Sequence, residues 1–410
     1  YLKFIPDILI IFMFFGYLFK NKFKLKFKVY DYFYILFLLG GFLSGIINNV
    51  SFIAILLHMR TYVTMYFLFY ILRNNEYEIQ FYKNCLKILM IALSVLTIIG
   101  IGEYITSKIY FFPYQWFIGI KYTSNLSRMY TLLHSPNTFG YYAVLVVSLF
   151  TYLYKDFKNK KWIFLLVLIF LGIILTQSRS SQVALVLILF YWSFGLFKKH
   201  DYKTLINIFL ILLLTFGTYK LCNYANRAFS NSDAYKSFFE ENTDRFDDNE
   251  NVIIDSGSRW NIAENNDVFY SMKNGRLFNI NLGFKIWKTK PLFGTGFATY
   301  GTAGSSVVIP KLYKQYNLSD DFYSDNQYIA IFVETGLFGT LMFAMFILTL
   351  IYEYRKDSYR LMIIFILMLV CLFYNVLELA VLMTLFYLIL TMNNKNEKTG
   401  KGVKLKMKKK

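Results

Sequence analysis

The chain has 410 residues, of which 56% are hydrophobic and 20% aromatic, and its formal net charge is +19. A composition this apolar excludes a single water-soluble core and predicts a membrane protein, whose apolar segments must cross a hydrocarbon layer of about 30 Å. The three cysteines have no paired spacing, so neither a disulfide framework nor a cysteine metal cluster is expected.

The pattern of apolar runs predicts an all-α polytopic membrane protein with eleven spans and one long polar insertion. The spans are expected near residues 2–19, 31–47, 52–72, 86–105, 138–154, 163–176, 182–197, 204–222, 327–352, 361–375 and 379–392. Four regions follow: an N-terminal bundle (1–222), a large loop (223–324), C-terminal spans (325–392) and a basic tail (393–410). Because the chain begins with Tyr1 rather than Met, we expect a further span before it, which would give twelve; the alternative is an N-terminus that faces outward.

Basic residues gather in alternate connections, which predicts the orientation. Cytoplasmic loops hold an excess of Lys and Arg, and the connections at 20–28, 73–83, 155–161, 198–203 and 355–360 are basic. The opposite set includes 106–136, 176–181 and the insertion 223–324, which are therefore expected to face outward. The terminal tail falls on the cytoplasmic side, where it would lie against anionic lipid rather than nucleic acid.

Two features that the sequence lacks narrow the classes of function to be considered. The chain has no G-x-x-x-x-G-K-[ST] motif and no long cytoplasmic connection, so ATP-driven transport by this chain alone is not expected. Synthetic chemistry on the outer face would need a substrate that is already activated and membrane-borne, such as a polyprenyl-diphosphate-linked sugar. A calcium loop beginning at Asp247 is not expected, because Val252 and Ser258 stand where such a loop needs Gly and Glu.

Two arginines are candidates for binding an anion. Arg179 lies in Thr176-Gln177-Ser178-Arg179-Ser180-Ser181, a very short connection at the outer membrane face, with Ser178 and Ser180 as further donors. Its guanidinium matches the planar, bidentate geometry of phosphate, although it could instead extend toward lipid headgroups. Arg276 follows Asn274-Gly275, and the alternative for it is a plain loop surface.

Other polar groups near or inside spans are weaker candidates. Asp325, in Ser324-Asp325-Asn326, could take a proton from an attacking hydroxyl or could simply cap the helix that follows. His58 and Arg60 are functional candidates because they lie within a predicted span. A structural role is favoured for His134, which precedes the entry to the fifth span at Pro136-Asn137.

Four motifs, in this order, resemble those of the O-antigen ligase and Wzy polymerase superfamily. They are Pro136-Asn137, Thr176 to Arg179 with Ser180, Pro291 to Gly296, and Asp325-Asn326 followed by Glu334-Thr335-Gly336 and Gly339. The resemblance extends from about Arg128 to Phe343. It implies a helical glycosyltransferase of the C type that needs no metal or other cofactor. It also implies undecaprenyl-diphosphate-linked oligosaccharide as substrate, the outer face of the bacterial cytoplasmic membrane as location, and a chain-length regulator as a partner.

One departure selects among these activities. Ligases of the superfamily usually carry His where this chain has Asp325, which favours a polymerase of oligosaccharide repeat units. The catalytic residues are then expected to be Arg179, Arg276 and Asp325. Substrate-binding roles are expected for Arg60, Arg128, Asn137, Ser178, Ser180, Arg259 and Asn326. A ligase, a flippase or other transporter, and a scaffold remain alternatives; the long outer loop favours an enzyme.

Overall fold

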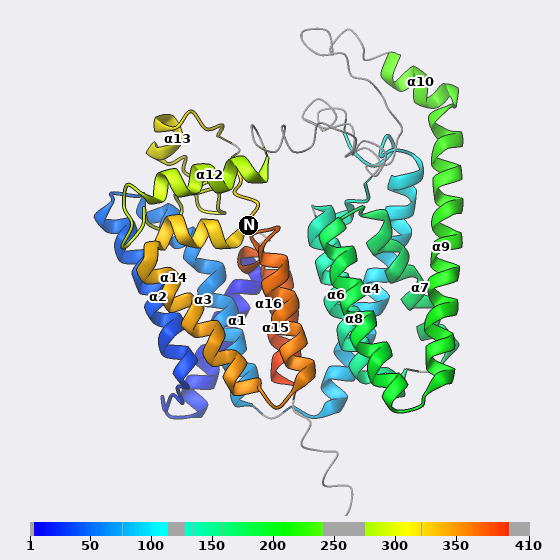
Figure 1. Cartoon of the computed structure of the whole chain (residues 1–410), viewed down its shortest axis with the longest axis horizontal. Coiled ribbons are helices and arrows are strands. Elements are labelled where there is room, and N and C mark those ends of the chain that lie inside the picture. Colours follow the sequence, from blue (N-terminus) through cyan, green and yellow to red (C-terminus); the bar gives the residue numbers. More distant parts are fainter. Residues whose placement is uncertain are drawn as a thin grey trace, which may run out of the picture.

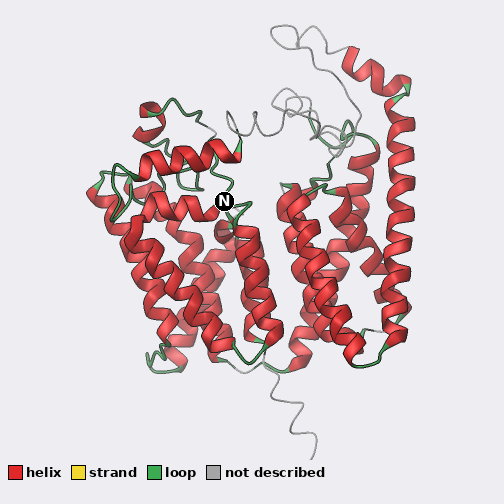
Figure 2. Ribbon diagram, in the orientation of Figure 1, coloured by secondary structure: helices red, strands yellow, loops and turns green. Residues whose placement is uncertain are grey.

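The computed structural model describes residues 4–75, 77–113, 128–133, 135–157, 159–240, 275–320 and 322–392, and the regular elements in these ranges are all helical (Figures 1 and 2). A helix stands at each of the eleven predicted spans: α1 (Ile5–Lys20), α2 (Val29–Ile47), α3 (Phe52–Asn74), α4 (Ile79–Ile105), α6 (Pro136–Leu153), α7 (Lys160–Leu175), α8 (Arg179–Lys198), α9 (Tyr202–Ser230), α14 (Gln327–Tyr354), α15 (Ser358–Cys371) and α16 (Ala380–Thr391). The predicted fold class is confirmed.

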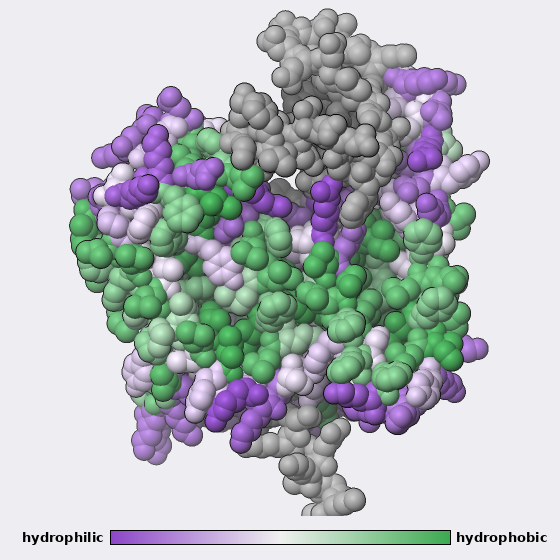
Figure 3. All heavy atoms as spheres, viewed as in Figure 1, coloured by the Kyte–Doolittle hydropathy of each residue, from purple (hydrophilic) through white to green (hydrophobic). Residues whose placement is uncertain are grey.

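Six of these helices, namely α2, α3, α4, α8, α9 and α14, are long and apolar enough to cross a membrane by length and composition. On the face shown in Figure 3, apolar side chains form a belt across the middle of the molecule, and polar side chains gather at its two ends. This distribution is what a bilayer requires, because lipid tails favour apolar surface and cannot satisfy polar groups. The protein is therefore a multi-pass membrane protein.

The helices form two groups that share one core (Figure 1). One group holds α1, α2, α3, α14 and α16, and the other holds α4, α6, α7, α8 and α9. Helix α16 packs against both α3 and α6, while α15 contacts α6 and α8. The buried side chains of both groups, from Phe37 in α2 to Val146 in α6, belong to a single hydrophobic cluster.

The two ends of the bundle differ in structure. One end carries α10 (Asp233–Glu240), α12 (Arg276–Trp287) and α13 (Lys311–Gln315), with α12 lying across the bundle over α14 (Figure 1). We call this end the loop face. The opposite end, the basic face, holds the connections that were predicted to be cytoplasmic. Helix α9 continues to Ser230, beyond the expected end of its span near residue 222.

Helix α14 is broken at Gly336, where φ is +62°. The segment Pro291–Gly296 fills the break and forms backbone hydrogen bonds on both sides of it. Before the break, Thr295 N–H donates to the Val333 carbonyl at 2.9 Å; after it, Leu337 N–H donates to the Pro291 carbonyl at 2.9 Å. Irregular backbone at this depth is tolerated only when its polar groups are satisfied, and this pairing satisfies them.

Two glycines make the pairing possible. A Cβ atom on Gly294 would lie 2.5 Å from the Gly336 nitrogen, and a Cβ on Gly336 would lie 2.5 Å from the Gly294 nitrogen. Both residues also have positive φ, +71° and +62°, a conformation that side chains disfavour. The Pro291–Gly296 and Glu334–Gly339 motifs are therefore two halves of one backbone junction, which we call the glycine junction.

We predict that Gly336→Ala lowers the thermal stability of the purified protein. The added methyl group would have to displace main-chain atoms and would keep a non-glycine residue in left-handed backbone, at a cost of at least about 1–2 kcal/mol. Gly217→Ala in α9 is the matched control, because a Cβ there meets nothing within 4 Å. Equal melting temperatures for the two variants in detergent would contradict the junction.

Candidate active site on the loop face

The Tyr141 hydroxyl of α6 belongs to a polar cluster on the loop face. It is hydrogen-bonded to the Ser180 hydroxyl at 2.5 Å. It also interacts electrostatically with Arg276, Tyr374 and Asp325. Since Ser180 directly follows Arg179, the cluster joins α6, α8, α12 and the entry to α14. Arg276 and Asp325, two of the residues predicted to be catalytic, thus lie within electrostatic range of the Tyr141 hydroxyl, and the third, Arg179, adjoins its hydrogen-bond partner Ser180.

Arg179 is the first residue of α8, and its side chain is exposed. The helix is preceded by Ser178, whose side chain makes no capping bond within the described part of the chain. The Ser178 hydroxyl instead lies 3.5 Å from that of Ser180. A helix N-terminus carries partial positive charge and N–H groups without helical partners. An arginine there adds to that charge, an arrangement suited to an anion.

Arg276 has the same place in α12 that Arg179 has in α8. It is the first helical residue, it is exposed, and Gly275 before it has no side chain with which to cap the helix. Its guanidinium donates to the Phe373 carbonyl at 3.4 Å and lies over the Phe373 ring. The cluster thus contains two helix N-termini, each beginning with an arginine.

Asp325 is held in left-handed backbone with φ +50°, just before α14. The alternative that it caps the helix is wrong, because Asn326 is the cap. The Asn326 side-chain oxygen accepts from Tyr328 N–H at 3.0 Å and Ile329 N–H at 3.1 Å, and its amide donates to the Leu372 carbonyl. Strained, non-glycine backbone of this kind concentrates at functional sites, and the Asp325 carboxylate is not consumed by capping.

Arg128 and Asn137, predicted to bind substrate, are engaged with each other. The Arg128 guanidinium is buried and donates to the Asn137 side-chain oxygen at 3.1 Å and to the Thr176 carbonyl at 2.9 Å. These bonds fasten the start of α6 to the end of α7, beside the turn that carries Arg179. The contacts of Arg128 and Asn137 therefore position this turn. That the two residues bind substrate stays a prediction.

Arg60 is paired with a residue that the sequence analysis did not connect to it. Its guanidinium lies 3.3 Å from the carboxylate of Asp7 in α1 and stacks over Phe4. Asp7 also accepts a hydrogen bond from Thr64 at 2.7 Å. This ion pair compensates the charge of Arg60 inside the bundle. Arg259 and His134 lie outside the described residues, so the expectations for them remain predictions.

Several polar residues near the cluster were missed. Tyr141 resembles an ordinary packing residue in an apolar helix, so no sequence signal marked it. Lys108 is fully buried next to Glu103 and Arg128, and burial lowers the pKa of its ammonium group to about 7. Glu334 was expected only as part of a motif, with no role of its own, and Glu378 was missed; both carry a sequence signal, because carboxylates within or beside apolar spans usually have a function.

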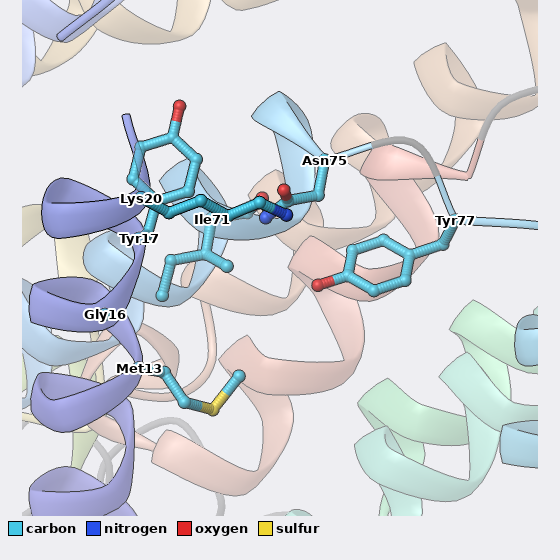
Figure 4. Close-up of a pocket in the computed structure, with 7 residues that line it drawn as sticks. All are labelled: Met13, Gly16, Tyr17, Lys20, Ile71, Asn75 and Tyr77. Carbon is cyan, nitrogen blue, oxygen red and sulfur yellow. The ribbon is translucent and has the colours of Figure 1, made fainter. Parts of the chain in front are cut away.

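An open cavity of about 570 Å³ lies on the basic face, between α1, the end of α3 and Tyr77 (Figure 4). Lys20 and Asn75 contribute polar atoms to its wall, and Met13 and Ile71 contribute apolar ones. It stands at the opposite end of the bundle from Arg179, Arg276 and Asp325. The cavity therefore does not belong to the loop-face cluster.

The fold and this cluster define a multi-pass membrane protein in which two arginines and an aspartate lie at one end of the helix bundle. Residues 164–344 match the family model described as O-Antigen ligase. The match includes Arg179, Arg276 and Asp325. No curated protein sequence matches the chain.

We predict that pyrophosphate, used as a soluble diphosphate, raises the melting temperature of the detergent-solubilised protein, since a ligand that binds only the folded state stabilises it. Arg179→Gln and Arg276→Gln should each lose most of this shift without lowering the basal melting temperature, because an arginine at a helix N-terminus opposes the dipole. Arg355→Gln, on the basic face, is the control and should keep the shift. Undiminished shifts in both loop-face variants would contradict a diphosphate site there.

Proposed function

We propose that the protein is a polysaccharide polymerase that joins oligosaccharide repeat units carried on a polyprenyl diphosphate, such as undecaprenyl diphosphate. The observation that carries this proposal is the placement of Arg276 and Asp325 within electrostatic range of Tyr141, whose hydrogen-bond partner Ser180 adjoins Arg179. The match of residues 164–344 to the O-Antigen ligase family model supports a lipid-linked glycan as substrate. Basic residues gather in the connections at the opposite end of the bundle. Because cytoplasmic loops hold the excess of Lys and Arg, this supports a loop face on the outer side of the membrane.

Arg179 and Arg276 would hold the diphosphate of the donor. Each presents a guanidinium at a helix N-terminus, so side-chain charge and backbone N–H groups act on the same anion. The negative charge on the diphosphate grows as it leaves the sugar, and fixed cations stabilise that developing charge more than they stabilise the bound donor. No general acid is required, because a diphosphate leaves readily without protonation. Ser178 and Ser180 supply further donors beside Arg179.

Asp325 would act as the general base toward the second repeat unit. Its carboxylate takes the proton from the terminal hydroxyl of the acceptor glycan. The hydroxyl oxygen then forms a bond to the anomeric carbon of the donor, while the bond from that carbon to the diphosphate breaks and its electron pair leaves with the phosphate. Attack opposite the leaving group inverts the anomeric configuration. The product is one repeat longer and stays on the acceptor's lipid carrier.

A ligase is the second candidate, because the matching family is described by that activity. It would use the same two arginines but transfer the finished glycan to a different lipid, protein or wall acceptor. Asp325, at a position where ligases of the superfamily usually have His, favours the polymerase. A flippase for the same lipid-linked unit needs no base beside the diphosphate, so the placement of Asp325 argues against it.

We predict that Arg179→Ala and Asp325→Asn each lower chain extension by about 10²–10³-fold, the usual range for loss of a transition-state donor or a general base. The measurement is a gel ladder formed by purified protein in liposomes with a lipid-linked repeat unit. Arg355→Ala is the control and should extend normally.

The product that forms in this assay distinguishes the polymerase from the ligase and from the flippase. Transfer of finished polymer to another acceptor, without extension of single units, would favour the ligase. Movement of the unit across the bilayer with no new glycosidic bond would favour the flippase. Normal ladders from both Arg179→Ala and Asp325→Asn would overturn the proposed mechanism.

A further inference from the structure

Three buried titratable side chains meet beneath the loop face, outside the arginine cluster. His58 of α3 lies with its Nε2 3.4 Å from the Glu334 carboxylate of α14 and its Nδ1 3.9 Å from the Glu378 carboxylate. Glu378 belongs to the short helix η6 (Val376–Glu378), which connects α15 to α16. The side chains are 0%, 2% and 5% exposed, respectively. Three elements thus bring one imidazole between two carboxylates.

The hydrogen bonding of this group is incomplete. Both ring nitrogens of His58 and Glu378 Oε1 have no hydrogen-bond partner among the described residues. Two ionised carboxylates and a neutral imidazole in such a setting would leave unbalanced negative charge in a dry interior, which is very costly. One additional shared proton reduces that charge and gives the imidazole or a carboxyl a donor. A proton is the fitting occupant, because no group of three His, Cys, Asp or Glu side chains in the described ranges could hold a metal ion.

Glu334 connects the triad to the loop between α12 and α13. Its Oε1 accepts hydrogen bonds from Thr299 N–H at 2.9 Å, Tyr300 N–H at 3.0 Å and the Thr302 hydroxyl at 3.0 Å. Glu378 accepts from Ala303 N–H at 2.6 Å. Both carboxylates therefore fix the same loop, which includes the neighbouring residue Gly301.

The loop in turn fixes the backbone at Asp325. The Gly301 carbonyl accepts from Ser324 N–H at 3.2 Å and from the Asn375 amide at 3.0 Å, and Asn375 also contacts the Ser324 hydroxyl. On the other side of Asp325, the Gln327 side chain accepts from Leu377 N–H at 3.0 Å. Hydrogen bonds on both sides of Asp325 thus restrain its left-handed backbone, and they connect it through this loop and η6 to the triad.

We propose that His58, Glu334 and Glu378 form a buried, proton-sharing triad that positions Asp325, an inference that rests on the proposed role of Asp325 as the base. The triad residues are positioning residues, because they act through the loop and do not touch the reacting groups. Loss of the shared proton would place a second negative charge in the interior and loosen the loop that holds Asp325.

The geometry has a consequence for pH. Burial and the neighbouring Glu334 carboxylate raise the pKa of Glu378 well above its ordinary value. The folded protein therefore holds this proton at pH values where the unfolded chain has released it, so stability falls as pH rises from the ordinary carboxyl pKa toward the raised one. The other titratable groups that interact with the two carboxylates come from α3, α13 and the entry to α14: Tyr62, Tyr313 and Tyr323.

The test combines kinetics and stability on the full-length protein in liposomes, with a lipid-linked repeat unit as substrate. Glu378→Gln keeps an acceptor for Ala303 but cannot ionise, so it should remove the alkaline decline of both kcat and melting temperature seen in wild type. His58→Phe should lower kcat by about 10–100-fold through misplacement of Asp325, with KM changed less than twofold. In the Asp325→Asn background, His58→Phe should cause no further loss. Glu353→Gln, an exposed carboxylate on the basic face, is the control.

An alkaline decline that persists in Glu378→Gln would overturn the triad, as would a full additional loss from His58→Phe in the Asp325→Asn background. Absence of chain extension by the wild-type protein would instead reject the polymerase. In that case the melting temperature of Glu378→Gln as a function of pH still decides whether the triad holds a proton.

Discussion

The glycine junction is the constraint on which the rest of this structure depends. Backbone hydrogen bonds between Pro291–Gly296 and the break in α14 hold two segments together where no side chain could fit between them. The segment before the junction leads from α12 and hence from Arg276, and the helix that it interrupts begins just after Asp325. Fixing the junction therefore fixes both residues relative to each other. Phe297, buried against α2 and α3, extends the same anchor into the core.

On the loop face, the placement of the two arginines that suits the proposed function lowers the stability of the helices they begin. Arg179 and Arg276 each begin a helix, where the dipole disfavours a cation by a few tenths to about 1 kcal/mol. Deeper arginines are compensated: Arg60 pairs with Asp7, and Arg73 in α3 pairs with Asp31 in α2 at 2.8 Å. Arg60 and Arg73 thus have carboxylate partners, whereas the role proposed for Arg179 and Arg276 is to bind an anionic ligand.

Much of the fold could be predicted because membrane spans obey a simple rule: long apolar runs form helices between polar connections. All eleven expected helices exist for that reason, and the departure at α9 arises because a helix can continue past the apolar run into the polar region. Arg179, Arg276 and Asp325 could be proposed because charged residues at the ends of apolar spans are conspicuous and their motifs resemble those of a known superfamily.

The remaining features depend on tertiary contacts that sequence spacing does not reveal. Whether Asp325 or Asn326 caps α14 could not be decided from neighbouring residues, since both side chains are good caps. The pairing of His58 with Glu334 and Glu378 joins residues that are hundreds of positions apart. Tyr141 is distinguished from a packing residue only by the position of its hydroxyl beside Ser180. Polar interactions of this kind depend on side-chain placement within about an ångström, which periodicity does not determine.

The most direct test of the account is an experimental structure of the protein in a lipid bilayer disc with undecaprenyl diphosphate bound. We predict that the diphosphate contacts both Arg179 and Arg276, with the Asp325 carboxylate facing the position that a sugar on the terminal phosphate would occupy. A diphosphate bound elsewhere, for example in the cavity between α1 and α3 on the basic face, would contradict the central claim that the loop-face cluster is the active site.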